Sequence, residues 1–278
     1  MSRVEHDQSP DASSPMNRAG LTGTDIALNF EGVQFVYPDG TEAIDEVSMA
    51  VPKGEIVSVI GPSGCGKSTL LRLATRLLLP TKGRMTFGQD IGERAVCMLF
   101  QEDVLLPWLT ARQNVLLHYR FQGRRKLKHA KEAKERVSDL IAMVGLSGFE
   151  DYYPRQLSGG MRRRIGLLQV IAHLPKVLLL DEPFSAIDEP TRIDIHQEVR
   201  SLLTRFGITA ILVTHDLAEA ISLSDRVIVL SQRPATIARE YPVDLGPNRN
   251  MRTLRESSSF LDLYGEIWQG LRHELDAK

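Results

Sequence analysis

The residues whose types and spacing most clearly specify chemistry form a glycine-rich segment, Gly61-Pro-Ser-Gly-Cys-Gly-Lys-Ser68. It fits the pattern G-x-x-x-x-G-K-[ST], the P-loop, in which backbone amides cradle phosphates, the lysine reaches the β- and γ-phosphates and the final hydroxyl ligates Mg²⁺. Apolar Glu55–Ile60 precedes it and leucine-rich Thr69–Ala74 follows, which is the strand–loop–helix context of a P-loop. The segment therefore predicts binding of a nucleoside triphosphate with Mg²⁺. The residues expected to hold the nucleotide are Gly61, Pro62, Ser63, Gly64, Cys65, Gly66, Lys67, Ser68 and Thr69.

Further polar groups follow two other apolar runs. Asp181 and Glu182 come directly after Val177–Leu180, and His215 comes shortly after Ala210–Val213. Asp181 is expected to hold Mg²⁺ together with the P-loop serine, while Glu182 is suited to orient or deprotonate the attacking water. Taken alone, an Asp-Glu pair after a strand is also typical of a surface turn or a helix cap. Beside a P-loop, the metal-binding interpretation is favoured.

Strands and helices in alternation are expected to position these groups. Between Ile26 and Val51, short alternating runs on either side of the turn Asp39-Gly40 predict an antiparallel β region. Beyond the P-loop, whose helix is expected to close at Pro80 and Gly83, strand-like runs alternate with helical patterns. This predicts an α/β fold with a mostly parallel sheet covered on both faces. Since ligands bind at the carboxyl ends of such strands, the motifs above are expected to converge on one site.

A further motif, Leu157-Ser-Gly-Gly-Met161, resembles the signature sequence of ATP-binding-cassette (ABC) ATPases. Alone, Ser-Gly-Gly before a helix is also an ordinary N-cap and turn. Other features of that family follow in the right order along the chain. Tyr37 lies at the position of the adenine-stacking aromatic residue, Gln101 at the Q-loop glutamine, Ser185–Asp188 at the D-loop and His215 at the switch histidine. The resemblance covers about residues 26–230.

The resemblance implies a P-loop NTPase (RecA-like) core, an N-terminal antiparallel β subdomain and an α-helical signature subdomain. It implies that each ATP lies between the P-loop of one protomer and the signature segment of another, so that ATP closes a dimer and its hydrolysis opens it. The implied catalytic residues are Glu182, His215 and Gln101. The implied metal ligands are Ser68, Asp181 and Gln101. The implied nucleotide contacts outside the P-loop are Tyr37, Ser158, Gly159, Gly160 and Asp188.

Four positions depart from the family pattern. Met161 replaces the glutamine that commonly ends the signature, Arg163 stands where glutamine is usual, and Ile187 replaces the D-loop leucine. Gln169 takes the place of an arginine in the helix after the signature, which leaves any contact of that arginine in doubt. The positions implied to be catalytic are intact, so ATPase activity is expected.

The chain has 278 residues and a net charge of −1, which gives no indication of a nucleic-acid partner. The expected layout is a disordered leader over 1–24, an ABC ATPase domain over 25–235 and a C-terminal extension over 236–278. The helical subdomain is expected over about 102–165, with a helix over Ala130–Val144. In the extension, a helix over Phe260–Leu275 is expected to pack on the sheet, with a regulatory or dimer-contact segment as the alternative. Its expected apolar face comprises Phe260, Leu261, Tyr264, Ile267, Trp268 and Leu271.

The sequence has no apolar run long enough to span a bilayer and no signal peptide. A cytoplasmic protein is therefore expected, and the resemblance implies that it is peripheral on the inner face of the cell membrane. Two cysteines, one of them in the P-loop, do not suggest a disulfide scaffold. The basic run Arg124–His129 is interpreted as a solvated loop and helix start, with an interaction patch as the alternative.

The apolar stretch after the Q-loop glutamine, Asp103–Thr110, lies where this family receives a helix of the membrane subunit. Trp108 is the preferred contact, whereas Val104 and Leu105 suit either that contact or the local core. Five segments are similar to those of the nitrate/sulfonate/taurine importers, namely Leu105–Trp108, Tyr153–Arg162, Asp181–Phe184, Thr214–Ala220 and Leu230–Pro234. That resemblance implies a separate permease, an extracytoplasmic solute-binding protein and uptake of a small anion. The alternatives are an exporter or lipid-trafficking ATPase and a soluble non-transport ABC ATPase.

Overall fold

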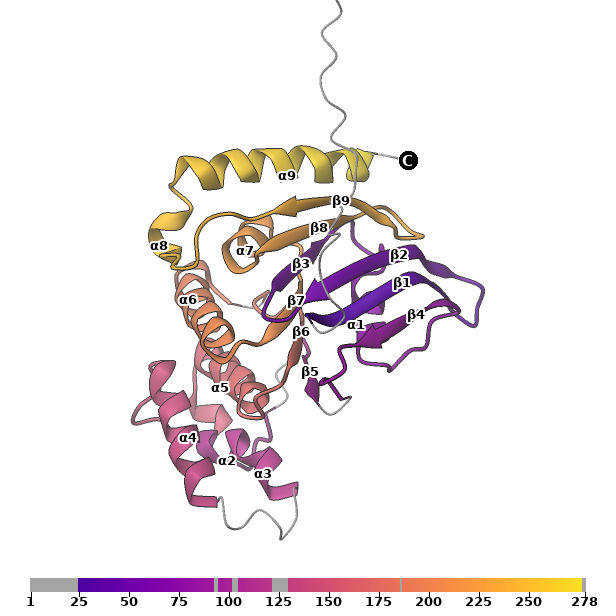
Figure 1. Ribbon diagram of the computed structural model, residues 1–278. Helices are drawn as coiled ribbons and strands as arrows, with labels where there is room; N and C mark the ends of the chain where they lie inside the picture. Colours follow the sequence, from indigo (N-terminus) through magenta and orange to yellow (C-terminus); the bar gives the residue numbers. More distant parts are fainter. Residues whose placement is uncertain (1–24, 93–94, 102–104, 122–129, 186, 277–278) are drawn as a thin grey trace, which may run out of the picture.

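The computed structural model describes residues 25–92, 95–101, 105–121, 130–185 and 187–276. The predicted leader 1–24, the basic run 124–129 and Val104 lie outside the described residues. In the described part, the chain builds two sheets and a layer of helices (Figure 1).

The smaller sheet is the antiparallel β region that the sequence predicts. It is three-stranded, in the order β2-β1-β4, and consists of β1 (Ile26–Val36), β2 (Glu42–Pro52) and β4 (Lys82–Phe87). Its inward side chains, among them Phe30 and Val47, join a core cluster that also contains apolar residues of the helix that directly follows the P-loop. This sheet is therefore packed close to the P-loop.

The larger sheet has six strands in the order β5-β6-β7-β3-β8-β9. Its strands are β5 (Val96–Leu99), β6 (Val177–Asp181), β7 (Thr209–Val213), β3 (Ile56–Ile60), β8 (Arg226–Leu230) and β9 (Ile237–Pro242). All neighbours are parallel except β9, which pairs antiparallel with β8. Every residue of β3, β7 and β8 is buried, as expected for strands of a parallel sheet that is covered on both faces. The expected mostly parallel α/β sheet is confirmed.

Four helices begin close to the predicted motifs. They are α1 (Lys67–Ala74), α5 (Gly159–Ile171), α6 (Glu189–Phe206) and α7 (Leu217–Leu223). Helix α1 ends at Ala74, so the expected closure at Pro80 and Gly83 is wrong. Arg76 adopts a left-handed φ of 59°, which a continuing helix does not permit, and Leu79 beyond it is 72% exposed. The leucines after Ala74 therefore do not extend the buried face of α1.

A helical layer projects from the sheet on the side of β5 (Figure 1). It contains α2 (Ala111–Val115), α3 (Leu117–Phe121), α4 (Ala130–Met143), a short 3-10 turn η3 (Pro154–Gln156) and α5. The helix predicted over Ala130–Val144 is confirmed, since Val137, Leu140 and Ile141 are buried in the core that also includes α5 and α6. Leu105 is partly buried against the same core.

The C-terminal part ends in α8 (Met251–Leu254) and α9 (Ser258–Asp276). Helix α9 runs beside β8 and β9, at the opposite end of the molecule from α4 (Figure 1). Phe260, Ile267 and Leu271 pack into a cluster with residues of β8, β9 and α7, so the expected packing on the sheet is confirmed. The expected face is too wide, because Leu261, Tyr264 and Trp268 are exposed by 56%, 37% and 45%.

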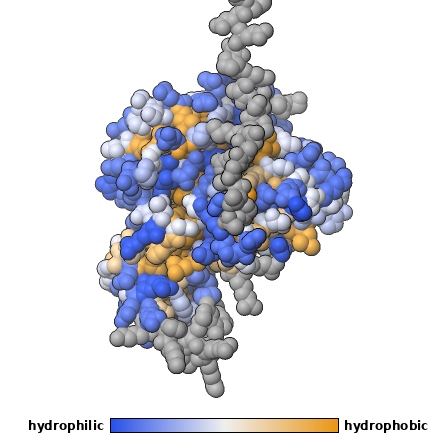
Figure 2. Space-filling view, viewed as in Figure 1, coloured by the Kyte–Doolittle hydropathy of each residue, from blue (hydrophilic) through white to orange (hydrophobic). Residues whose placement is uncertain are grey.

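Helix α9 approaches β9 closely at Gly270. A Cβ at this position would lie 2.2 Å from the Tyr241 hydroxyl, so the packing leaves no room for a side chain there. Hydrophobic areas interrupt an otherwise largely hydrophilic surface (Figure 2). Of the helices in the described part of the chain, none is long and apolar enough to cross a membrane.

Candidate nucleotide-binding site

The P-loop connects the end of β3 to the start of α1. Gly66 has a φ of 127°, and a Cβ there would lie 2.8 Å from the Ala43 carbonyl, so the turn into α1 accepts only glycine without strain. The Lys67 ammonium donates to the carbonyls of Gly61 and Pro62 at 2.9 and 2.8 Å. The lysine charge is thus held over the loop itself, beside the N-terminus of α1, where an anion is favoured.

Ser68 and Asp181 meet although they are far apart in the sequence. The Ser68 hydroxyl donates to Oδ1 of Asp181 at 3.1 Å, because α1 starts beside the carboxyl end of β6. Burial raises the pKa of the Asp181 carboxyl, and the hydrogen bond from Ser68 opposes that rise. A hydroxyl and a carboxylate side by side are oxygen ligands of the kind Mg²⁺ takes together with substrate phosphates. These residues therefore fit the expected metal.

Glu182 and His215 are brought together by the neighbouring strands β6 and β7. The His215 Nδ1 lies 3.2 Å from Oε2 of Glu182, and the Glu182 amide donates to the Val213 carbonyl at 2.9 Å. Glu182 has a left-handed φ of 43°, a costly conformation for a residue with a side chain. The turn lets the chain leave β6 with the Glu182 carboxylate facing the histidine.

Gln101 follows β5 and reaches the same end of the sheet. Its side-chain amide donates to the Ser185 hydroxyl at 3.5 Å, and that hydroxyl donates to the Glu182 carbonyl at 3.2 Å. Asp188 has a local role as the N-cap of α6, because its carboxylate accepts a hydrogen bond from the Thr191 amide. Hydrogen bonds from Thr191 lower the pKa of Asp188.

Tyr37 lies between the small sheet and the P-loop helix. Its hydroxyl is 2.9 Å from Oγ1 of Thr69, and its ring meets Phe35 edge-on with the centroids 4.9 Å apart. The structure therefore places the residue expected to stack on adenine next to the expected phosphate site.

The signature segment is positioned by other elements. Ser158 is the N-cap of α5, and its hydroxyl accepts a hydrogen bond from the Met161 amide at 3.2 Å. A Cβ on Gly160 would lie 2.7 Å from Cγ2 of Thr191, so α5 and α6 pack closely there. The Leu157 amide donates to the Pro154 carbonyl at 3.2 Å, so the segment is held by η3 as well as by α5 and α6. Met161 and Ile187, two of the departures from the family pattern, are partly buried apolar residues against the same core.

The contacts of Arg163 could not be predicted from the sequence, in which this residue only stands out as a departure from the family pattern. The Arg163 guanidinium donates to the carbonyls of Phe100 and Gln101 at 3.0 and 3.2 Å. No local pattern signals this contact, because it joins segments about sixty residues apart.

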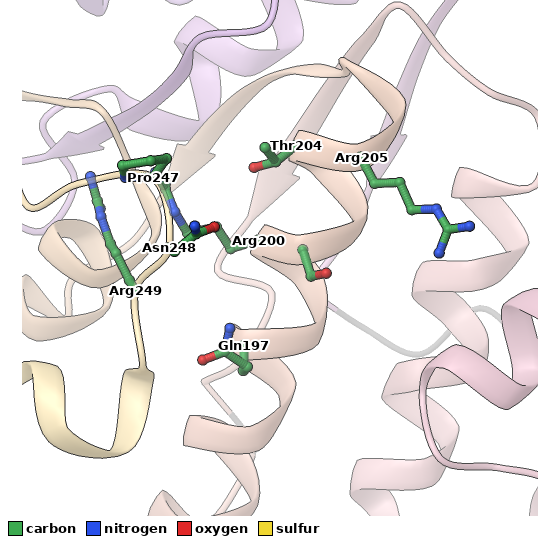
Figure 3. Close-up of a pocket in the computed structure, with 8 residues that line it drawn as sticks. Gln197, Arg200, Thr204, Arg205, Pro247, Asn248 and Arg249 are labelled. Atoms are coloured by element: carbon green, nitrogen blue, oxygen red, sulfur yellow. The ribbon is translucent and has the colours of Figure 1, made fainter.

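A cavity of about 240 Å³ lies elsewhere, between α6 and residues 247–249 (Figure 3). Its lining residues include Arg200, Arg249 and Asn248, and no predicted site residue is among them. Arg249 donates to three backbone carbonyls of residues 221–224 at the end of α7, while Arg200 pairs with Asp225 at 2.9 Å. Burial, with the Arg200 charge nearby, lowers the pKa of Arg249 to about 10. These arginines close the end of a helix and do not belong to the nucleotide site.

The comparisons with known proteins agree with the site. Residues 44–185 match the family model described as ABC transporter. The chain belongs to the ABC transporter family. A putative ATP-binding protein of Brucella abortus is 36% identical over 253 residues, 89% of this chain and 94% of the relative. An aliphatic sulfonates import ATP-binding protein of Pseudomonas savastanoi is 43% identical over 213 residues, 77% of this chain and 84% of the relative.

Solved ABC cassettes share the fold. A dimeric ATP-binding cassette in a post-hydrolysis state, bound to ADP and Pi, superposes with a TM-score of 0.64 at 29% identity, over 78% of this chain and 98% of that chain. The cbiO1 protein of Clostridium perfringens, part of an ABC transporter complex, gives a TM-score of 0.71 over 91% of this chain and 99% of that chain. At 23% identity, it supports the fold alone. The family assignment confirms the expected ABC ATPase class and the resemblance to sulfonate importers.

Proposed function

We propose that this ABC ATPase powers uptake of a small anion, such as nitrate, a sulfonate or taurine, through a separate membrane permease. The proposal is supported by the relative named for aliphatic sulfonate import and by the importer-like segments of the sequence. Its further partners would be a second ATPase protomer and, indirectly, an extracytoplasmic solute-binding protein. The protein would then work at the inner face of the cell membrane.

The residues of the site have separate tasks in this proposal. Lys67 and the P-loop amides bind the β- and γ-phosphates of ATP, and Tyr37 stacks on the adenine. Ser68, Asp181 and Gln101 would hold Mg²⁺, which when bound neutralises charge that develops on the phosphates. Glu182 orients the attacking water and accepts its proton, while His215 holds the Glu182 carboxylate in place.

The second half of the site would come from another protomer. Ser158, Gly159 and Gly160 lie at the start of α5, where amides and the helix dipole favour an anion. Facing the γ-phosphate bound by a partner's P-loop, they would make ATP part of the dimer interface. ATP then favours the closed dimer and hydrolysis removes that preference.

The observation that carries the hydrolytic part of the proposal is the contact of Glu182 with His215 beside the Ser68–Asp181 pair. We expect Glu182→Gln to lower the ATPase rate by about a hundredfold or more, because the amide cannot accept the proton. ATP binding should persist, and gel filtration with ATP should show a trapped dimer. Glu256→Gln, at an exposed position before α9, serves as the control and should behave like the wild type. A Glu182→Gln protein with a near-normal rate would refute the assigned role.

The transport task is tested separately. Affinity purification from detergent-solubilised membranes should recover the permease, and the ATPase rate of that complex should rise with the transported solute and its binding protein. Sulfonates, nitrate and taurine are the solutes to compare. Recovery of no membrane protein, or of an exporter, would contradict the importer assignment while leaving the ATPase assignment intact.

A further inference from the structure

Arg163 joins two motifs of one chain, the signature segment and the Q-loop, that would act on different nucleotides in the proposed dimer. It lies on α5, three residues after Gly160, and only 4% of it is exposed. Its guanidinium donates from Nη2 to the Phe100 carbonyl at 3.0 Å and from Nη1 to the Gln101 carbonyl at 3.2 Å. The signature helix is thus bonded to the backbone of the Q-loop glutamine.

The contact continues toward the hydrolytic carboxylate. Gln101 donates from its side-chain amide to Ser185 at 3.5 Å, and Ser185 donates to the Glu182 carbonyl at 3.2 Å. A path of hydrogen bonds therefore runs from α5, through Arg163 and Gln101, to the residue proposed to activate water. The first two steps join segments that are distant along the chain, and only the last is local, so the path depends on the tertiary structure.

The chemistry of arginine suits this link. The guanidinium is planar, always charged and presents several N–H groups in a fixed arrangement, so it can donate to two consecutive carbonyls at once. Charge-assisted hydrogen bonds inside a protein are stronger than neutral ones. A shift of α5 would therefore carry the Q-loop backbone with it. The glutamine usual at this position in the family has a shorter side chain without a charge.

We propose that Arg163 is a positioning residue that transmits closure of the signature segment on a nucleotide to Gln101 of the same chain. Closure at one site of the dimer would thereby set the geometry of the other site. This inference rests on the proposed function, because it requires that the signature segment engages a nucleotide held by a second protomer.

The test compares Arg163→Met with Arg164→Met. Arg164 is the matched control, since it is the next residue of α5 and its Nε donates to Glu198 at 2.9 Å, away from the Q-loop. We expect Arg163→Met to lower kcat for ATP hydrolysis about tenfold or more, because small displacements of catalytic groups are costly. KM for ATP should stay within about threefold, because the P-loop contacts remain. Arg163→Lys should recover part of kcat, since it restores a charged donor but not the two-pronged geometry.

The outcomes separate this inference from the proposed function. An inactive wild type would refute the function itself. An active wild type with equal kcat values for the two methionine variants would overturn the role of Arg163 alone. A parallel loss of ATP binding and thermal stability in Arg163→Met would indicate a merely structural role. If Arg163→Met does not fold, Arg163→Lys decides: a wild-type kcat would contradict the proposal, and a lowered kcat at unchanged KM would support it.

Discussion

The residues expected to act on the nucleotide already have partners within the chain. The Lys67 ammonium is bound by two P-loop carbonyls, Ser68 by Asp181, and Glu182 by His215. Groups held in this way need little rearrangement when the nucleotide arrives, and preorganised polar groups are a main source of catalytic stabilisation.

The contact between His118 and His173 predicts that the stability of the protein depends on pH. The rings of His118 and His173 lie with their centroids 3.3 Å apart. Burial, together with the neighbouring His118, lowers the pKa of His173 from 6.5 to about 4. Folding therefore favours neutral His173, and between those two values the unfolded chain binds a proton that the folded chain does not. The free energy of unfolding should fall as the pH falls through this window.

We expect His173→Gln to remove that part of the acid sensitivity. Urea unfolding at about pH 7 and about pH 5 should show a smaller loss of stability for the variant than for the wild type. The titrating groups outside this pair are common to both proteins, so the difference between the two curves reports the contact of His173 with His118. Parallel curves for the two proteins would contradict the prediction.

At the scale of elements, the contact between α5 and α6 sets how closely the signature segment approaches the D-loop. Gly160 near the start of α5 lies against Thr191 in the first turn of α6, with no room for a Cβ. Asp188 caps the same end of α6. The two motifs are thus held together by one tight helix contact, and a side chain at Gly160 would force them apart.

We expect Gly160→Ala to destabilise the protein by about 1–3 kcal/mol through overpacking. Without the clash, alanine in a helix would stabilise by about 0.5–1 kcal/mol, so the sign of the change in unfolding free energy is informative. Thr191→Ser removes the offending methyl group and should restore most of the stability in the double variant. Urea unfolding of the four proteins measures this coupling. An additive double variant would argue against the tight contact.

At the scale of the whole molecule, the helical layer and the C-terminal helix lie at opposite ends (Figure 1). Each end exposes one of the two tryptophans of the chain. Trp108, after the Q-loop, is 66% exposed, and Trp268 on α9 is 45% exposed. An exposed aromatic residue is a common anchor of a protein interface. The position of Trp108 beside the Q-loop makes it the proposed contact of the permease.

We expect Trp108→Ala to weaken recovery of the permease from solubilised membranes by about tenfold or more, while ATP binding by the isolated cassette is unchanged. Trp268→Ala is the matched control, because it removes the other exposed tryptophan from the far end of the molecule. Equal recovery with both variants would exclude Trp108 as an anchor. Loss of ATP binding in Trp108→Ala would assign it a different role.

Much of the fold could be predicted because its signals are local. The turn at Asp39-Gly40, the apolar runs of the strands and the period of the helix at Ala130–Met143 all lie in short windows of sequence. The expected end of helix α1 at Pro80 and Gly83 is wrong because the leucines after Ala74 are also typical of a continuing helix. The left-handed turn at Arg76 has no composition signal, since arginine is an ordinary helix residue.

The P-loop chemistry and the placement of Asp181 and His215 at strand ends could be predicted from the order of residues, because motif spacing and hydrophobic period are properties of neighbouring residues. The packing of the chain decided which face of α9 is buried and that Arg163 holds the Gln101 backbone. It also decided that Glu182 meets His215 across two strands. These contacts join segments distant along the chain, and their geometry follows from how the helices and strands pack together.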